Sequence, residues 1–340
     1  MACAWENKQR CVEVCLGDIG NYVYVGFDTP GVSLIEVSQD LSGYVNNGVV
    51  GSFPLQSDKR GRPGIFSKAR NVFRTGFDTA TNPDTSYISR HDGAGTFSVV
   101  STAPNLRDYL NHPSPAFVGG RIRATDWGPN GSLYTSDDGE TWTVVAGPLT
   151  GIYAQAYTVL GSRLVAALDT GGGVSMYYSD NNGASWQAAS GGGGSWPEAI
   201  FFHAGSNILR PSYGDFMYIT TDGATWTVPS GVNSFSGQGY EPRIATDGSG
   251  TVIATGFTTQ SVFARSTNDG ASWSMRTFTD AGVPTDSGTH GIFWDGAQFV
   301  CFVDRSDTGN YQIYTSPTGL TWTAGLIIPE IIEHVTQIID

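Results

Sequence analysis

The sequence predicts an all-β fold built from seven repeats of about 45 residues. A turn motif ending in tryptophan recurs at Trp142, Trp186, Trp226, Trp273 and Trp322, and two fainter copies end at Tyr44 and Phe97. A short apolar segment precedes each copy, ending near Phe27, Phe77, Asp126, Leu168, Tyr213, Phe257 and Val303. The chain also contains 45 glycines and many aromatic residues, which suits short strands joined by tight turns.

The turn motif is clearest in residues 135–142, which read Thr-Ser-Asp-Asp-Gly-Glu-Thr-Trp. Asp137 is predicted to accept hydrogen bonds from backbone N–H groups of the turn, and Gly139 to supply a positive φ. Trp142 opens the next strand, where its indole can lie under the turn as an apolar plug.

The later copies vary around this motif, and we predict the tryptophan copies to be structural. Asn181 and Asn268 replace the aspartate in two copies, Pro317 stands at that position in the last, and residues 219–226 keep only the Gly-x-Thr-Trp end. The glycine and tryptophan are retained in all four, as Gly183 and Trp186, Gly223 and Trp226, Gly270 and Trp273, and Gly319 and Trp322.

The octet resembles the Asp box, or BNR repeat, of sialidases and other β-propellers, and the resemblance covers nearly the whole chain. With a period suited to four-stranded blades, it implies a seven-bladed β-propeller. In that family the boxes lie between the third and fourth strands of a blade and do no catalysis. Ligands bind on the opposite face. We expect an N-terminal segment (1–10), the propeller (11–326) and a C-terminal apolar docking segment (327–340).

Composition excludes several classes of function. The net charge of −13, with few lysines, argues against binding nucleic acid through its phosphates. No stretch is long and apolar enough to span a membrane, and the N-terminus lacks the pattern of a secretory signal. Cys11 and Cys15 lie about 13 Å apart on one face of a predicted strand, which is too far for a disulfide. We therefore expect free thiols in a reducing cytoplasm, with no metal and no cofactor.

Five of the predicted second strands end in aspartate, at Asp28, Asp78, Asp126, Asp169 and Asp304. Such a ring of carboxylates could hold a cation or sugar hydroxyls. The alternative, which we favour, is that each aspartate caps a turn through its own backbone.

A second group is expected at the mouth of the central channel, where Glu198, Glu241, Arg243 and His290 begin the inner strands of successive blades. Two nearby carboxylates are what glycoside hydrolysis requires. The sialidase pattern is nevertheless missing: there is no Arg-Ile-Pro start, no arginine triad and no Tyr–Glu pair. We therefore predict ligand contacts rather than catalytic residues at Trp127, Trp196, Glu198, Tyr240, Glu241 and Arg243.

The C-terminal residues Pro329–Asp340 carry an apolar stripe that fits either a short helix or a strand completing a sheet. Pattern alone leaves open whether this segment docks on the propeller, on another copy of the chain or on a different protein.

The overall composition, poor in lysine and rich in glycine, small polar and aromatic residues, resembles that of bacteriophage virion proteins. We predict a non-enzymatic tail or fibre component, located in the virion and made in the host cytoplasm. Its expected partners are other virion proteins, through the C-terminal segment, further copies of itself, and a host-surface glycan. The alternative is a glycoside hydrolase of the sialidase-like propeller type that uses Glu198 and Glu241. A photosystem assembly factor is a third class, but the chain lacks the export signal and basic patch of such propellers.

Overall fold

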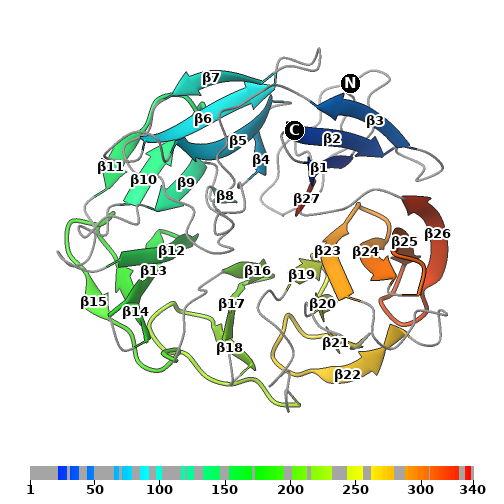
Figure 1. Ribbon diagram of the computed structural model, residues 1–340. Helices are drawn as coiled ribbons and strands as arrows, with labels where there is room; N and C mark the ends of the chain where they lie inside the picture. The colour runs from blue at the N-terminus through cyan, green and yellow to red at the C-terminus, as the bar shows by residue number, and fades with distance from the viewer. Residues whose placement is uncertain are drawn as a thin grey trace, which may run out of the picture.

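The computed structural model shows strands arranged in a ring of antiparallel sheets (Figure 1). It describes residues 22–28, 31–37, 44–49, 65–68, 71–78, 85–91, 97–101, 116–118, 121–125, 133–145, 153–170, 173–194, 201–212, 216–231, 243–255, 262–278, 288–305, 307–328 and 334–337. Within these ranges all the regular elements are strands, and no helix is long and apolar enough to cross a lipid bilayer. The prediction of an all-β fold is therefore confirmed.

The described strands form seven sheets, which we number in chain order. The first three sheets contain β27 (His334–Gln337), β1 (Tyr22–Asp28), β2 (Gly31–Val37) and β3 (Tyr44–Val49); then β4 (Ile65–Lys68), β5 (Asn71–Asp78), β6 (Thr85–His91) and β7 (Phe97–Ser101); then β8 (Ala116–Val118), β9 (Arg121–Thr125), β10 (Leu133–Ser136) and β11 (Thr143–Val145). The fourth and fifth sheets contain β12 (Tyr153–Leu160), β13 (Arg163–Asp169), β14 (Val174–Ser179) and β15 (Gln187–Ala188); then β16 (Phe202–Ala204), β17 (Asn207–Ser212) and β18 (Phe216–Thr220). The last two contain β19 (Arg243–Thr246), β20 (Val252–Thr255), β21 (Val262–Ser266) and β22 (Ser274–Thr277); then β23 (Gly288–Trp294), β24 (Phe299–Arg305), β25 (Asn310–Ser316) and β26 (Thr323–Ile328).

Strands follow one another outward from the centre of the ring (Figure 1). The seven apolar segments found in the sequence correspond to the second strands, β1, β5, β9, β13, β17, β20 and β24. Because each repeat adds a sheet beside the last, the chain grows around the ring rather than enlarging one core.

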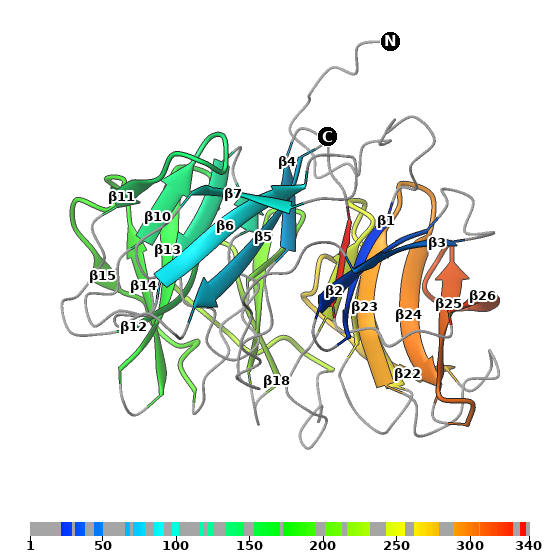
Figure 2. The same ribbon diagram turned by 45° about the horizontal axis from the view of Figure 1, so that its top comes forward.

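The C-terminal strand β27 occupies the innermost position of the first sheet. It pairs antiparallel with β1, from Tyr22 opposite Gln337 to Val25 opposite His334, and lies between β23 and β4 (Figures 1 and 2). Of the two alternatives for the tail, residues 334–337 therefore form the strand that completes a sheet. The predicted strand that holds Cys11 and Cys15 lies outside the described residues.

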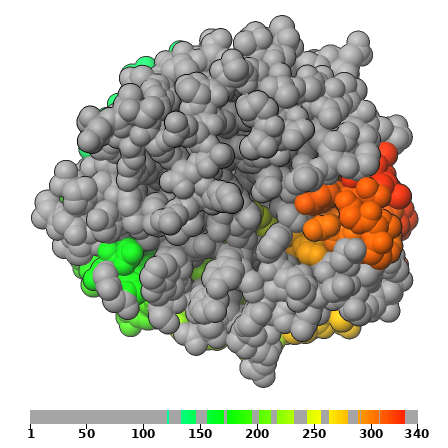
Figure 3. Space-filling model, in the orientation of Figure 1, coloured from blue at the N-terminus to red at the C-terminus, as the bar shows by residue number. Residues whose placement is uncertain are grey.

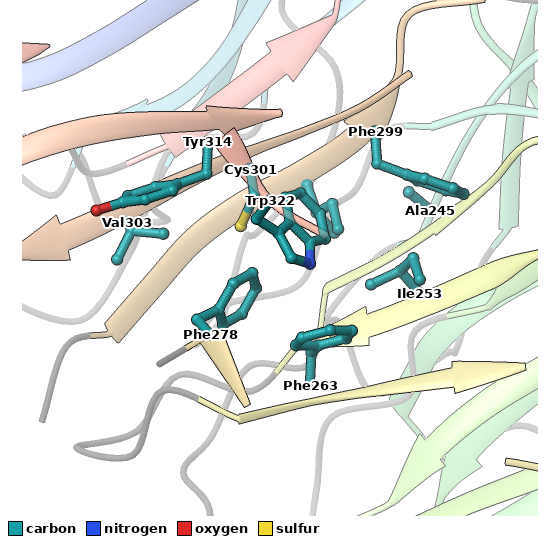
Figure 4. Close-up of a cluster of buried hydrophobic side chains, with 10 residues drawn as sticks. Ala245, Ile253, Phe263, Phe278, Phe299, Cys301, Val303, Tyr314 and Trp322 are labelled. Atoms are coloured by element: carbon teal, nitrogen blue, oxygen red, sulfur yellow. The ribbon is translucent and has the colours of Figure 1, made fainter. Parts of the chain in front are cut away.

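The hydrophobic core lies between neighbouring sheets. One cluster contains Phe263 and Phe278 of the sixth sheet region, together with Trp322 of the seventh (Figure 4). The ring centroids of Phe278 and Trp322 are 5.0 Å apart, and those of Phe263 and Phe278 are 4.6 Å apart. Cys301 in the same cluster is a buried free thiol whose pKa is raised by burial. Each such cluster joins two sheets, so packing between sheets holds the ring together.

Candidate ligand pocket and the box turns

The five turns that carry the tryptophan motif share one hydroxyl anchor. We call residues 136–142, 179–186, 220–226, 266–273 and 316–322 the box turns. Each begins at the last residue of a third strand, which is Ser136, Ser179, Thr220, Ser266 or Ser316. The hydroxyl of this residue accepts a hydrogen bond from the N–H of the box glycine at 2.8–2.9 Å in every turn. The sequence did not reveal this anchor, because matching the copies by their glycine and tryptophan places the hydroxyl residue at the first position of some octets and at the second position of others.

The box turns come in two lengths. The glycine follows the hydroxyl residue by three positions in turns 136–142, 220–226 and 316–322, and by four positions in turns 179–186 and 266–273. The additional residue in the longer turns is Asn182 or Asp269, with φ of 55° and 54° respectively. Asn and Asp are the side chains that tolerate this left-handed conformation best.

The two lengths correct the predicted role of Asp137. Oδ1 of Asp138 accepts hydrogen bonds from the N–H groups of Glu140 (2.8 Å) and Thr141 (2.7 Å), whereas Asp137 forms an ion pair with Arg121. The acceptor lies two residues after the residue that carries the hydroxyl. In the shorter turn 136–142 that position is Asp138, whereas the octet pattern assigns the role to Asp137, one residue earlier. By the same rule Asp222 is the acceptor in turn 220–226, and Thr318 rather than Pro317 stands at this position in the last turn.

Hydrogen bonding holds the acceptor carboxylates ionised. The pKa of Asp138 is lowered to about 2, chiefly by the backbone N–H of Thr141. Burial opposes this shift, and the N–H of Glu140 and the Ser136 hydroxyl add to it. Burial alone would raise the pKa of Asp222, but hydrogen bonds from Thr225, Ala224 and Thr220 lower it overall.

Three box turns are bound by a side chain of the preceding sheet. The acceptor is the carbonyl of the residue before the box glycine. Arg163 Nη1 donates to the carbonyl of Asp222 (2.5 Å), Asn207 Nδ2 to that of Asp269 (2.9 Å), and Arg265 Nε to that of Thr318 (2.8 Å).

The box tryptophans of these turns lie in the same seams, by which we mean the packed contacts between two neighbouring sheets. Trp226, Trp273 and Trp322 are buried in clusters with residues of the preceding sheet. Two box indoles also bind their own turn: Nε1 of Trp142 donates to the carbonyl of Gly139 (3.2 Å), and Nε1 of Trp273 to that of Gly270 (2.8 Å). These turns therefore lie where neighbouring sheets meet.

Most of the predicted ligand-contact residues, namely Trp127, Trp196, Glu198, Tyr240 and Glu241, lie outside the described residues. Arg243 is the half-buried first residue of β19, opposite Thr255 of β20. His290 belongs to β23, at a register shift between Thr289 and Gly291. Since β19 and β23 are neighbouring inner strands, their backbones place these two residues on adjacent sheets. The grouping with the carboxylates stays a prediction.

The aspartates at the ends of the second strands occupy corresponding positions. Asp28, Asp78 and Asp169 are the last residues of β1, β5 and β13, and Asp304 precedes the last residue of β24. Asp126 lies outside the described residues. Burial raises the pKa of the Asp304 carboxyl. In the part of the chain that the structure describes, no three His, Cys, Asp or Glu side chains gather in a way that could hold a metal ion.

A pocket of about 420 Å³ lies between the third and fourth sheets. It is bounded on one side by β9, β10 and β11 and on the other by the longer box turn 179–186. In the space-filling view, described side chains of this part of the chain (green) reach the surface at the rim of the molecule (Figure 3). The lining residues are Arg121, Thr135, Thr143, Val144, Val145, Asn181, Asn182, Gly183 and Ala184.

The pocket combines hydrogen-bonding groups with apolar surface. Nε and Nη2 of Arg121 bind the carboxylate of Asp137, which fixes the guanidinium and leaves Nη1 outside that ion pair. Asn182 is exposed, and Val144 is 58% exposed. Among these described lining residues there is no carboxylate, imidazole or thiol that could act as a general acid, base or nucleophile. The arrangement can bind a polar small molecule, and its volume is typical of such sites.

Comparisons with known proteins bear on the fold alone. No protein-family model matches the chain, and no curated protein matches it. A protein from Lactobacillus plantarum is similar in structure, with a TM-score of 0.59 and 10% identity over 93% of this chain and 99% of that one. A putative 6-phosphogluconolactonase from Bacteroides uniformis gives a TM-score of 0.55 and 11% identity over the same shares of the two chains.

A GH74 xyloglucanase from Xanthomonas campestris gives a TM-score of 0.51 and 13% identity, over 77% of this chain and 45% of the enzyme. The similarity therefore extends to less than half of that enzyme. Together with the ring of antiparallel sheets, the comparisons show that this chain is an all-β protein with a β-propeller fold.

Proposed function

We propose that this chain is a non-catalytic binding module whose ligand, a glycan, occupies the pocket between the third and fourth sheets. The observation that carries the proposal is the lining itself. Hydrogen-bonding side chains stand beside an exposed valine, and the described lining residues include no acid, base or nucleophile.

The chemistry of the lining suits a sugar ring. The Asn182 amide and the Thr143 hydroxyl can each donate and accept hydrogen bonds. Sugar hydroxyls do the same, so the two kinds of group are suited to each other. Arg121 adds donors at Nη1, and Val144 offers an apolar surface to the C–H face of a ring. Because Asp137 neutralises the Arg121 charge, an uncharged sugar is favoured over an acidic one.

We further propose a bacteriophage virion as the setting, with this chain as a tail or fibre component. The support is compositional: few lysines, abundant glycine and many aromatic residues. Contact with other virion proteins through residues 327–340, and association with further copies of this chain, remain part of this proposal. An antibody against the purified chain should label intact particles prepared from a culture that carries the gene, and a failure to label them would remove the virion setting.

The binding proposal is tested with a glycan array, followed by titration calorimetry on the best ligand for wild type and three variants. Asn182→Gly removes the amide but keeps a residue that adopts positive φ readily. Thr143→Val removes the hydroxyl with little change of shape. Each should weaken binding about tenfold, since a lost hydrogen bond costs about 1–1.5 kcal/mol.

Asp269→Gly is the matched control, because Asp269 has the same backbone conformation in the other longer box turn. It should bind like wild type. Equal binding by wild type and Asn182→Gly would place the ligand elsewhere. Hydrolysis of the glycan, abolished in Glu198→Gln or Glu241→Gln, would instead establish the glycoside hydrolase alternative.

A further inference from the structure

Arg210 is a fully buried arginine in β17, at the seam between the fourth and fifth sheets. Its position can be compared with the neighbouring sheets, because Val165, Leu209 and Ile253 each lie against the box glycine of the following sheet. The next residue along the three strands is Ala166, Arg210 and Ala254, respectively. The corresponding strands of the two neighbouring sheets have an alanine at the position of Arg210. The fold therefore does not require a charged side chain there.

The guanidinium of Arg210 is only partly satisfied. Nη1 donates to the carbonyl of Gly192, and the group lies 5.7 Å from the ring centroid of Tyr218. Nε and Nη2 are buried, and they have no hydrogen-bond partner among the described residues. Burial lowers the pKa of Arg210 to about 10, with a small opposing effect of Tyr218, so the side chain is still a cation at neutral pH.

Nε and Nη2 form one edge of the guanidinium, and other arginines of this chain use this edge to bind carboxylates. Nε and Nη2 of Arg163 contact the two carboxylate oxygens of Asp180 at 2.7 and 3.0 Å. The same pair of nitrogens binds a carboxylate in Arg121 with Asp137 and in Arg305 with Asp307. Those acids are on the surface, where an unpaired arginine would be hydrated. At Arg210 water is excluded, and an uncompensated buried charge is strongly unfavourable.

We propose that the Nε–Nη2 edge of Arg210 binds an oxyanion, the carboxylate or phosphate group of a small ligand, in the seam between the fourth and fifth sheets. Two parallel N–H donors match two oxygens of either group, which gives a bidentate contact. The Gly192 carbonyl and the Tyr218 ring hold the guanidinium in place for it. This site is separate from the glycan pocket between the third and fourth sheets and does not depend on it.

The test uses the purified full-length chain in thermal unfolding scans with phosphate, acetate or chloride added at constant ionic strength. A ligand that binds only the folded state raises the midpoint temperature as its concentration increases. Phosphate or acetate, but not chloride, should raise the midpoint of wild type by about 2–4 °C at saturation. The ratio of the phosphate and acetate effects shows which oxyanion the site prefers.

Arg210→Met should abolish the anion effect, whereas Arg276→Met, which removes an exposed arginine from β22, should retain it. Equal shifts in all three proteins would be a general salt effect and would overturn the proposal. If Arg210→Met does not fold, wild type is titrated with radiolabelled phosphate by equilibrium dialysis. One saturable site that acetate competes for supports the proposal, and no saturable binding up to about 10 mM, a concentration well above a weak specific affinity, overturns it.

Discussion

The shorter and longer box turns place the box glycine in the same way with different numbers of residues. In both, a hydroxyl accepts a hydrogen bond from the glycine N–H, and a second acceptor, two residues after the hydroxyl residue, binds at least one N–H group that follows the glycine. Two of the three shorter turns use Asp138 and Asp222 as this acceptor and the third has Thr318, whereas the longer ones use Asn181 and Asn268. The difference is one left-handed residue before the glycine, Asn182 or Asp269.

The glycine is what both lengths must place correctly, because it lies against the preceding sheet. An added Cβ would stand 2.3–2.6 Å from a side chain in the second strand of the preceding sheet. This holds for Gly223 and Gly319 in shorter turns and for Gly270 in a longer turn. The hydroxyl and the neighbouring sheet therefore fix the two ends of the turn, while its middle can vary by one residue.

The largest expected effect is that of Gly319→Ala. The new methyl group would stand 2.3 Å from Cδ1 of Ile253, and φ at this position is +69°. A left-handed alanine costs about 1–2 kcal/mol and overpacking about 1–3 kcal/mol, so we expect the free energy of unfolding to fall by about 3 kcal/mol in urea denaturation.

Gly309→Ala separates the two contributions to this loss. Gly309 has a similar φ of +66°, but a Cβ there would meet nothing within 4 Å. Its substitution should cost about 1 kcal/mol, the backbone contribution alone. Equal losses at both positions would show that contact with the preceding sheet adds nothing.

A smaller effect is expected when the pH is lowered, and it should be confined to the shorter turns. The pKa of Asp138 is about 2 in the folded chain and about 3.9 in an unfolded one, so its contribution to stability is complete above pH 4 and is lost as the pH falls towards 2. Because this side chain is exposed, we expect about 1 kcal/mol between pH 6 and pH 2.5 after allowing for solvent screening. Asp138→Asn should lose less stability than wild type over this interval in denaturant titrations.

The reciprocal change, Asn181→Asp, should add acid sensitivity to a longer turn. If both variants follow wild type at every pH, the Asp138 carboxylate does not contribute through its charge.

The smallest effect is expected from deleting Asn182, which converts the longer turn 179–186 into the shorter form. Hydroxyl, acceptor and glycine then have the spacing found in turn 220–226. We expect a loss of less than about 1 kcal/mol in thermal unfolding, since the chain already folds turns with this spacing. A loss above about 2 kcal/mol would mean that the contact between this turn and the third sheet requires the longer form.

Much of the fold could be predicted because it depends on local patterns. The apolar segments identified the second strands, and the Gly-x-Thr/Ser-Trp ends identified the turns that follow third strands. A tail strand was among the alternatives for residues 327–340, but its pairing with β1 is a contact between the two ends of the chain, which periodicity does not reveal.

The candidate sites were harder to predict, because they depend on which sheets meet. Nothing in the sequence around Arg121 and Asn182 indicates that these residues line one pocket, since they belong to different sheets. Arg210 looks like any arginine in a short strand until the neighbouring sheet covers it. The predicted channel-mouth group of Glu198, Glu241, Arg243 and His290 stays a prediction, because both glutamates lie outside the described residues.

The sequence alone was enough to predict an all-β repeat fold and the residues that turn the chain, because strand alternation and turn chemistry act over a few neighbouring residues. That Asp138 rather than Asp137 accepts the turn hydrogen bonds, and that Arg210 is buried with Nε and Nη2 lacking a described partner, follows from the folded structure and not from local sequence. Both outcomes depend on distances and desolvation set by packing. A carboxylate binds the N–H groups that the folded turn presents, and a guanidinium lacks a partner only when a second sheet has removed its water.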